Sequence, residues 1–513
     1  MKVYDVAIVG LGPVGCTTAI LLAEAGLRVV AFERDPEIYK LPRAVNLDGE
    51  IIRNFQRHGR GKAVQDLMQP VRPGDRAGFA NSKREWMFGA EARSFGGNGW
   101  QPMNMFDQPE FESYLRHEAV SHAQVTAHLG VEVHSTQNSD DGVLVRYGRG
   151  ETASARYAIA CDGAASPTRK AFEIGWRDLG YNHDWLVVDV KTRDGHTLGN
   201  ATMQVCDPDR ISTYVCTKDP YRRWEFKMNP SETAEQMLEE EMIMSLIDPW
   251  TPRGTYVIRR AAVYQFHAAT ADQWRIGNIF IAGDAAHQTP PFLGQGMNTG
   301  MRDAINIAWK LPLVLHGLAG DALLDTYYSE RNTHAHDLVD WAVSIGMLME
   351  HLAEVERCQR EGLPPPPEEK DKIRSSGYGQ GREQPPIREG AVLLDQVNDK
   401  GSTGYLLSQP IVENEAGDRF RFDELLGPDM AIVTRNAELP EFPDDVQAVI
   451  NRLEIKLVST EGLKSVQGHM DRLFEKNEAA IVRPDRIVFG HTTQSLSLDE
   501  LVLQLAEKLH LSV

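Results

Sequence analysis

The chain has 513 residues, too many for one hydrophobic core, and this length predicts two or three domains. Its 54 basic and 73 acidic side chains leave a net charge of −19, which makes nucleic acid and anionic membranes poor partners. Five cysteines without CxxC or metal-type spacing, with no long apolar run and no signal-peptide core, predict a cytoplasmic protein without a metal site.

The first elements along the chain follow the order strand, helix, strand. Residues 3–9 form an apolar, β-branched run, and residues 13–25 are helical in composition and end at Gly26. Residues 27–32 form a second apolar run. This βαβ opening predicts a domain of the Rossmann type.

The turn between the first strand and the helix reads GLGPVG, and Glu33 follows after 17 intervening residues. Gly10 permits the tight turn, Gly12 lets the backbone approach a pyrophosphate, and Gly15 allows the helix to pack on the strand. Glu33 can accept hydrogen bonds from a ribose. The pattern predicts a dinucleotide site, whereas an ordinary glycine turn is the alternative.

The rest of the chain divides into four further stretches. Residues 185–266 alternate short extended segments with turn residues, as in an antiparallel sheet. Residues 297–315 keep helical spacing, with a kink expected at Pro312. Residues 360–390 are rich in Pro, Gly and charge and predict a linker or long surface loop, and residues 391–513 suffice for a small α/β domain.

A second glycine-rich stretch, GDAAHQTPPFLGQGMNTGMRDA, joins an apolar run to this helix. Asp284 lies just after the apolar run, where it can bond the ribityl hydroxyls of a flavin. Residues 294–298 present amide N–H groups at a helix start, and these can face the edge of the flavin where negative charge accumulates on reduction. Two such sites far apart in the chain fit one extended cofactor and favour FAD.

Longer stretches carry a resemblance to a known family. The GLGPVG turn, CDGAASPTRK at 161–170 and the stretch from 283 onward resemble the single-component FAD-dependent aromatic hydroxylases of the para-hydroxybenzoate and phenol hydroxylase type. PRAVNLDGEIIR, WLVVDV, RRWEFKMNPSETAEQM and ALLDTYYSERNTHA are similar to the 3-(3-hydroxyphenyl)propionate hydroxylase branch. LLSQPIVENEAGDRFRFDELLG and VRPDRIVFG resemble the C-terminal, thioredoxin-like domain of that branch, here without CxxC.

The resemblance implies an α/β fold, α+β overall, with a Rossmann-like FAD-binding domain, an inserted antiparallel-sheet substrate domain and a C-terminal thioredoxin-like domain. The boundaries expected are 1–180 and 271–360 for the two parts of the FAD-binding domain, 181–270 for the substrate domain, 361–390 for a linker and 391–513 for the C-terminal domain.

The resemblance also assigns site residues by position. Those expected to bind the cofactor are Gly10, Gly12, Pro13, Val14, Gly15, Glu33, Arg34, Arg43, Ala44, Gln108, Arg116, Asp162, Gly163, Gly283, Asp284, Pro290, Gly294, Gln295, Gly296, Met297 and Asn298. Arg43 and Pro290 are also expected near the reacting atoms. The stretch at 289–292 varies within the branch, so the pocket wall it forms is not carried over.

The activity that the resemblance implies is an NAD(P)H- and O2-dependent hydroxylation of a small phenolic compound, ortho to its hydroxyl, through a flavin hydroperoxide. With one dinucleotide fingerprint in the chain, NAD(P)H is expected to visit a surface groove, and the choice between NADH and NADPH stays open. An FAD enzyme of another reaction type and a non-catalytic FAD-binding protein are the alternatives. A homodimer is expected only because dimers are common.

Deprotonating a phenol raises the nucleophilicity of its ring, so a base or hydrogen-bond acceptor is expected beside the substrate oxygen. Tyr264 and His267, on the strand before the second glycine-rich stretch, are the candidates, and a core tyrosine and a turn histidine are the alternatives. Arg222 and Arg223 are candidates for a substrate carboxylate, and a solvated surface pair is the default for them.

Other residues have ordinary structural roles as their default. His287 is expected to bond neutrally within its loop, and residues 239–241 to be the solvated face of a helix. Three tryptophans are candidates for an aromatic pocket, with core packing as the default: Trp86, Trp100 and Trp224.

Overall fold

The computed structural model describes residues 3–367, 384–398, 402–436 and 441–511. Its first sheet has a parallel core of β1, β2, β7, β10 and β17, in which β2, β17 and the C-terminal halves of β1 and β10 are apolar and buried. The strands in spatial order are β16 (Arg275–Ile276), β17 (Ile279–Ile281), β10 (Glu151–Ala160), β1 (Val3–Val9), β2 (Val29–Glu33) and β7 (Val125–Leu129), and β8 (Val133–Ser139) and β9 (Gly142–Tyr147) extend it beside β10.

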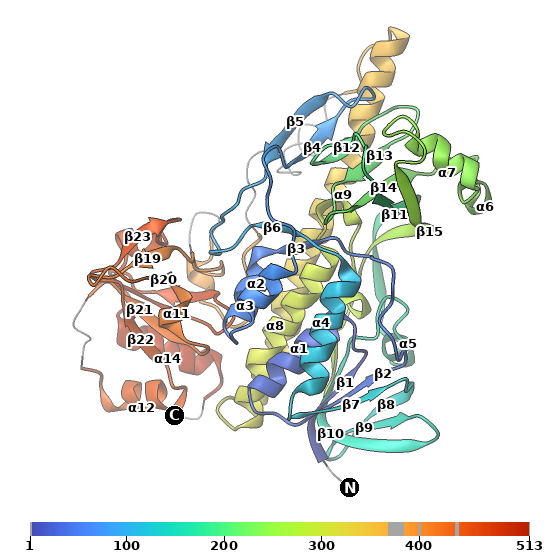
Figure 1. Ribbon diagram of the computed structural model, residues 1–513. Helices are drawn as coiled ribbons and strands as arrows, with labels where there is room; N and C mark the ends of the chain where they lie inside the picture. The colour runs from blue at the N-terminus through green and yellow to red at the C-terminus, as the bar shows by residue number, and fades with distance from the viewer. Residues whose placement is uncertain (1–2, 368–383, 399–401, 437–440, 512–513) are drawn as a thin grey trace.

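Helices cover this sheet, and α1 follows β1 directly, which confirms the predicted βαβ opening (Figure 1). The helix α1 packs closely on α8 because Gly300 of α8 has no side chain to separate them. Smaller elements complete this part of the molecule. The elements are α1 (Pro13–Glu24), β3 (Asn46–Asp48), α2 (Gly49–Gln56), α3 (Gly61–Asp66), β6 (Met103–Met105), α4 (Gln108–Ser121) and α5 (Pro167–Ala171).

A second sheet of eight strands lies above the first in Figure 1. Its strands are, in spatial order, β18 (His287–Gln288), β15 (Tyr256–Ala271), β11 (Trp176–Thr192), β14 (Tyr221–Lys227), β13 (Ser212–Val215), β12 (Ala201–Val205), β4 (Arg76–Ala80) and β5 (Trp86–Glu91). The sheet draws strands from outside 181–270, since β4 pairs with β12 and β5 pairs with β4 at the edge of the sheet. The domain boundaries at 181 and 270 stay predictions.

The two faces of this second sheet have different neighbours. Alternate residues such as Leu186, Trp224 and Phe226 point to one face and pack on the short helices α6 (Ala234–Met237) and α7 (Glu240–Ile247). The intervening residues point to the other face, toward the first sheet. The antiparallel sheet predicted for the middle of the chain is therefore confirmed. Because side chains alternate along its strands, every second residue points to the inner face of the sheet.

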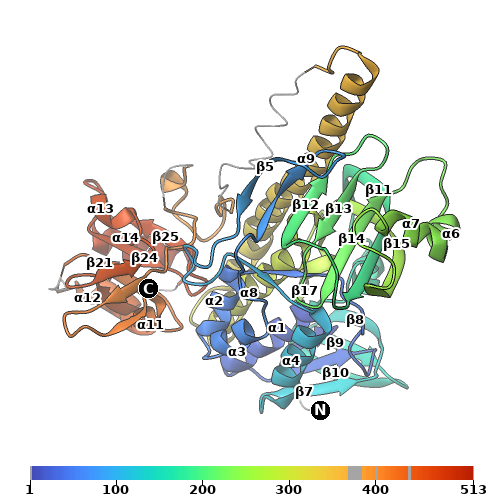
Figure 2. The ribbon, with the colours of Figure 1, turned by 45° about the horizontal axis from the view of Figure 1, so that its top comes forward.

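Two long helices connect these layers. The helix α8 (Gly296–Leu315) begins at the second glycine-rich stretch, as predicted, and contains Pro312 within its last turn. The helix α9 (Thr326–Glu361) has 36 residues, and its C-terminal end projects beyond the second sheet in both Figure 1 and Figure 2. None of the helices within the described ranges is long and apolar enough to cross a membrane.

The C-terminal part lies to one side of both sheets (Figure 2). It has the order βαβ–ββα, with β21 parallel to β22 and antiparallel to β24, which is the arrangement of a thioredoxin-like core. Of the predicted linker at 361–390, residues 368–383 lie outside the described residues. The elements are β19 (Ile411–Glu413), β20 (Arg419–Arg421), α11 (Asp423–Leu426), β21 (Ala431–Thr434), α12 (Asp444–Arg452), β22 (Lys456–Ser459), β23 (Lys464–Gln467), α13 (Leu473–Lys476), β24 (Ala479–Val482), β25 (Val488–His491) and α14 (Leu498–Lys508).

Candidate functional site

A cavity of about 1590 Å³ extends from the carboxyl ends of the parallel strands to the inner face of the second sheet. Ligands bind at this edge in open α/β sheets. Most of the residues predicted from the sequence line the cavity: Gly10, Gly12, Pro13, Val14, Glu33, Arg34, Arg43, Ala44, Gln108, Arg116, Asp162, Gly163, His267, Gly283, Asp284, Gly294, Gly296 and Met297. Five do not contribute to the lining: Gly15, Tyr264, Pro290, Gln295 and Asn298.

The glycine turn has the geometry that its spacing predicts. Gly10 has φ of 94°, and a Cβ atom there would lie 2.5 Å from the Cys161 carbonyl oxygen. A Cβ atom on Gly15 would lie 1.9 Å from the Gly10 oxygen, so Gly15 serves the contact between helix and strand. A Cβ atom on Gly12 would have no neighbour within 4 Å, so this position leaves open space in the cavity wall.

The acid at the end of β2 fixes this turn. Glu33 accepts hydrogen bonds from the Leu11 N–H at 2.8 Å and the Asp35 N–H at 2.9 Å. Arg116 donates to the Leu11 carbonyl at 3.2 Å and lies 4.0 Å from Glu33, while its Nε is buried without a partner among the described residues. An ordered carboxylate and an unsatisfied buried donor thus lie at the same end of the cavity.

A third strand end supplies Asp162. One of its carboxylate oxygens accepts the Thr168 N–H at 3.0 Å, and the other is buried with no partner among the described residues. Buried polar atoms are rarely left unpaired, so this oxygen points to a ligand. Gly163 follows it with φ of 79° and has no atom within 4 Å of a would-be Cβ.

The turn that carries Asp284 is held from below by a buried carboxylate. Asp303 of α8 accepts the Gly283 N–H at 3.0 Å, His287 Nε2 at 2.7 Å and Arg331 Nε at 2.9 Å. Asp284 itself lines the cavity, and its side chain is exposed there. The protein around the cavity raises the pKa of the Asp284 carboxyl, and His287 and Arg43 oppose the rise.

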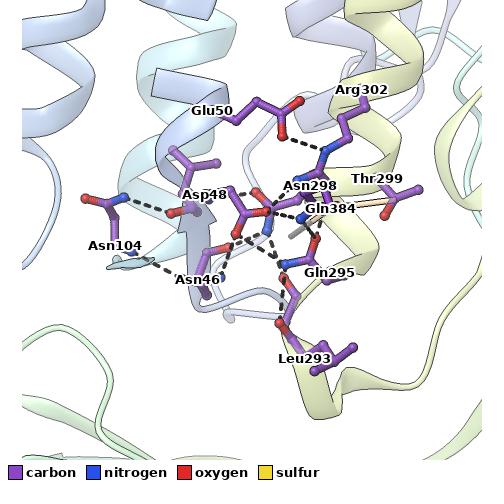
Figure 3. A network of polar contacts seen from close by, with 12 residues as sticks. Asn46, Asp48, Glu50, Asn104, Leu293, Gln295, Asn298, Thr299, Arg302 and Gln384 are labelled. Carbon is purple, nitrogen blue, oxygen red and sulfur yellow. Dashed lines mark hydrogen bonds and ion pairs between the residues drawn. The ribbon is translucent and has the colours of Figure 1, made fainter. Parts of the chain in front are cut away.

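The stretch at 294–298 belongs to a network of polar side chains under the cavity wall (Figure 3). Asn298 accepts the Asp48 N–H at 2.9 Å and donates to the Gly294 carbonyl at 2.8 Å. Gln295 donates to Asp48 at 3.2 Å and accepts from Arg302 at 3.0 Å. The side chains of Gln295 and Asn298 therefore hold the turn itself, and only their backbone is left to meet a cofactor.

The segment of Arg43 and Ala44 is clamped on both sides. Gln108 Oε1 accepts both backbone N–H groups, at 2.8 and 2.7 Å. Arg223 of β14 donates to the carbonyls of Arg43 and Pro42, each at 2.7 Å. The guanidinium of Arg43 makes no hydrogen bond within the described residues and lies over the Tyr39 ring.

Arg222 and Arg223 are both buried, so the expected solvated surface pair is wrong. Arg222 pairs with Asp219 at 2.8 Å, and Arg223 pairs with Asp189 at 2.8 Å as well as with the clamped carbonyls. Most donors of Arg223 are thus already used, and it positions a backbone segment. Sequence reasoning missed this role and missed Asp189, because their partners are far away in the chain.

The end of the cavity at the second sheet is aromatic. Phe266 and Phe292 line it, and Trp185 packs on both rings, with centroids 5.5 and 5.4 Å away. His267 also lines the cavity and bonds Asn182 at 2.7 Å. Tyr264 lies under the Arg260 guanidinium, so of the two candidate bases only His267 reaches the cavity.

The remaining sequence candidates occupy structural positions. Trp224 is fully buried in the core behind the second sheet, as its default predicted, and Trp100 is buried in the core of the first domain. Trp86 stacks with Arg76. His287 is bonded to Asp303 of α8, which corrects the expected bond within its own loop, because α8 passes directly beneath it.

The residues at the first end of the cavity fit an extended dinucleotide. Gly12 and Gly163 leave open space where side chains would project, and the buried Asp162 oxygen and Arg116 Nε lack partners in the described chain. The cavity is larger than that of a typical small-ligand pocket, for which about 300–1,000 Å³ is usual. There is room for a long cofactor and a second, smaller molecule.

Comparisons with known proteins agree with this geometry. The family described as FAD binding domain matches residues 3–342, and the family described as HcaD C-terminal domain matches residues 404–508. A 3-(3-hydroxy-phenyl)propionate/3-hydroxycinnamic acid hydroxylase of Klebsiella pneumoniae (strain 342) is 31% identical, covering 99% of this chain and 95% of the relative. A second enzyme of that name, from Burkholderia vietnamiensis (strain G4 / LMG 22486), is 31% identical over 95% of this chain and 93% of its own length.

Solved structures share the fold along the whole chain. The complex of aklavinone-11 hydroxylase with FAD and aklavinone has a TM-score of 0.79 at 24% identity, covering 99% of both chains. The flavin-dependent monooxygenase PieE, in complex with FAD and substrate, has a TM-score of 0.78 at 20% identity, also covering 99% of both chains. The predicted fold class is confirmed.

Proposed function

This chain belongs to the family of FAD-dependent aromatic hydroxylases, and we propose that it uses NAD(P)H and O2 to hydroxylate a small phenolic compound ortho to its hydroxyl. One observation carries the proposal: a single cavity joins the glycine turn and Glu33 at one end to an aromatic wall at the other. A cofactor and a phenol can therefore lie end to end in one enclosed space.

The chain's own residues hold the cofactor at three strand ends. Gly10 and Gly12 let the backbone approach a pyrophosphate, and Glu33 and Arg116 lie where a ribose would bind. When bound, FAD supplies the transfer of reducing equivalents from NAD(P)H to O2 that ring hydroxylation needs. Asp284, and the backbone at 294–298, border the part of the cavity between this end and the aromatic end.

The aromatic end determines what the enzyme accepts. Phe266 and Phe292 exclude water from the ring that reacts and offer it edge and face contacts. Arg222 and Arg223 are engaged within the protein, so they are not proposed as the partners of a substrate carboxylate. The phenylpropionate and cinnamate skeletons in the names of the relatives are the first substrates to test.

A panel of monohydroxylated aromatic acids tests the function. The purified flavoprotein is mixed with each compound, with NADH or NADPH, in air, and nicotinamide oxidation, hydrogen peroxide and hydroxylated product are measured together. Phenol-stimulated oxidation with a catechol-type product supports the proposal. Oxidation that never depends on a phenol identifies another flavin reaction, and no reduction of the flavin at all identifies a binding protein.

A homodimer and a cytoplasmic location stay predictions. Sedimentation of the purified holoprotein tests the first, and a single species with the mass of one chain would contradict it.

A further inference from the structure

Glu225 is a buried acid on the inner face of the second sheet. It lies on β14 opposite Val187 of β11 and Thr213 of β13, and it is 4% exposed. Its neighbours Trp224 and Phe226 point into the core behind the sheet. Because side chains alternate along a strand, Glu225 points the other way, and it lines the cavity.

The Glu225 carboxylate has no hydrogen-bond donor of its own among the residues that the structure describes. The hydroxyl of Thr213, opposite it, donates instead to Gln204 at 2.6 Å. The nearest cation is Arg223 at 3.9 Å, beyond hydrogen-bond distance, and its donors serve Asp189 and two backbone carbonyls. Buried acids are almost always paired, so these carboxylate oxygens need a partner in the cavity.

The charged groups around Glu225 come from three strands. Arg223 lies on β14 itself, Asp189 on β11 and Arg260 on β15, while Thr213 on β13 is neutral. Burial raises the pKa of Glu225 to about 7, although Arg223 and Arg260 oppose the rise and Asp189 adds to it. Near neutral pH both forms of this carboxyl are populated, as general acid–base chemistry requires.

We propose that Glu225 is the catalytic base that accepts the proton of the substrate's phenolic hydroxyl, an inference that rests on the proposed function. The hydroxyl O–H bond breaks, its electron pair stays on the phenol oxygen and feeds the ring, and the proton passes to a Glu225 oxygen. When the hydroxylated ring regains its aromaticity, the C–H bond at the hydroxylated carbon breaks, its electron pair returns to the ring and its proton leaves to solvent. The proton held by Glu225 returns to the phenol oxygen, and Glu225 ends the turnover as a carboxylate.

This assignment differs from both sequence candidates. His267 lines the cavity but is bonded to Asn182, and Tyr264 lies outside the lining. A phenol has a pKa of about 10. An ordinary glutamate, at about 4.3, is a much weaker base toward it than a buried one. Glu225 therefore lines the cavity, has carboxylate oxygens free to accept a hydrogen bond, and has a basicity closer to that of the phenolate.

The variant Glu225→Gln tests the inference through proton uptake as well as turnover. The ligand is a nitrophenol, added at a pH where both it and the free enzyme's carboxylate are ionised, and calorimetry in two buffers measures protons taken up on binding. If Glu225 shares a proton with the bound phenol, the wild type takes up about one proton from the buffer for each ligand bound. The variant Glu225→Gln takes up none. Hydroxylation should fall about 100-fold or more.

The pH profile gives a second readout. In the wild type kcat/KM falls as pH drops below about 7, because Glu225 becomes protonated, and this limb should vanish in Glu225→Gln. The matched control Glu239→Gln makes the same change at an exposed site and should keep both the uptake and the limb. Retained uptake and an unchanged limb in Glu225→Gln, or loss of both only in His267→Asn, would overturn the assignment.

The experiment also distinguishes a variant that fails to fold, and a failure of the proposed function, from a failure of the inference. If Glu225→Gln does not fold or hold FAD, Glu225→Asp carries the test: it keeps the carboxylate but withdraws it by one methylene, so proton uptake should persist while kcat falls. An unchanged kcat in Glu225→Asp contradicts the role. If the wild type hydroxylates no phenol, the proposed function fails; if it does and Glu225→Gln equals it, only the inference fails.

Discussion

The carboxylate of Asp303 fixes the backbone turn that carries Asp284. It is fully buried and accepts from a backbone amide, from His287 and from Arg331. Burial alone would raise the pKa of Asp303, but His287 and Arg331 lower it below its usual value. A buried charge with this many partners stabilises the fold only while all of them are present.

Replacing this residue should uncouple the turn from the helix beneath it. Asp303→Asn leaves Arg331 without its counter-charge and His287 without its carboxylate partner, and it should cost about 3–5 kcal/mol of unfolding free energy. Because the folded pKa lies below the ordinary value of 3.8, the stabilisation is present above that pH and is lost as pH falls further. Urea unfolding of the holoprotein and its flavin content measure both effects. Asp140→Asn, in the exposed turn between β8 and β9, should change neither, and an equal loss in both variants would contradict the assignment.

Substitutions at two glycines of the first turn should have different effects, one on the stability of the protein and the other on FAD binding. Gly15→Ala places a Cβ atom 1.9 Å from the Gly10 oxygen and should destabilise the protein by about 1–3 kcal/mol or more. Gly12→Ala meets no protein atom within 4 Å, so thermal unfolding of the apoprotein should be unchanged. The same methyl group occupies the cofactor's space and should weaken FAD binding about 10- to 100-fold, measured by flavin fluorescence. Unchanged affinity in Gly12→Ala would contradict the placement of the cofactor.

At the scale of elements, the helix α9 forms part of the aromatic end of the cavity. Its Gly346 lies against two rings, and a Cβ atom there would be 2.7 Å from Tyr181 and 2.9 Å from Phe292. The missing side chain lets the helix approach the second sheet closely. The position of Phe292, which lines the cavity, therefore depends on one glycine of a helix 36 residues long.

A methyl group at this position should change the substrate site and leave the cofactor site intact. Gly346→Ala forces Phe292 or Tyr181 to move, at a packing cost of about 1–3 kcal/mol. We expect KM for the phenolic substrate to rise about 5-fold, equivalent to about 1 kcal/mol, with unchanged flavin content. Gly199→Ala, at a position with no neighbour within 4 Å, is the control. Weaker flavin binding with an unchanged KM would contradict this account and would show that α9 shapes the cofactor end of the cavity.

Elements that depend on local sequence were predictable, and those that depend on distant partners were not. The βαβ opening, the helix after the second glycine-rich stretch and the glycine turn follow from spacing within about 30 residues. Arg223 and Glu225 lie in the quoted stretch RRWEF, yet nothing local shows that alternate residues there face a cavity. The network of Asp48, Gln295 and Arg302 joins residues about 250 apart, and β4 joins the second sheet by pairing Arg76 with Ala201, 125 residues further along the chain.

At the scale of the whole molecule, two buried ion clusters join the C-terminal part to the helices of the flavin-binding part. In the first, Arg53 of α2 donates to Asp423 at 2.7 and 2.8 Å, and Arg486 also pairs with Asp423. In the second, Glu330 of α9 pairs with Arg483 at 2.8 Å and with Lys310 of α8 at 3.0 Å. These contacts and the apolar cluster that Trp309 and Leu323 form with the C-terminal part hold the two parts side by side (Figure 1).

The second cluster should make stability sensitive to acid. Burial would raise the pKa of Glu330, but Arg483 and Lys310 lower it to about 2. The folded value lies below the ordinary 4.5, so the stabilisation is present above pH 4.5 and is lost as pH falls toward 2. Glu330→Gln should cost about 3–5 kcal/mol near neutral pH, measured by urea unfolding. It should also remove that part of the acid sensitivity. Glu389→Gln, at an exposed position, is the control, and an unchanged unfolding midpoint in Glu330→Gln would contradict this account.

The C-terminal part also reaches the turns that line the cavity. Gln384 donates to Asp48 and Gln295 at 3.5 and 3.4 Å, and Gln409 bonds Gln56 of α2. A chain cut before residue 384 would leave Arg53 without Asp423 and Glu330 without Arg483, on a newly exposed apolar surface. A chimera that exchanges this region with a relative must therefore keep the partners on both sides of each ion cluster. Otherwise Arg53 of α2 and Glu330 of α9 would be buried without the C-terminal residues that pair with them.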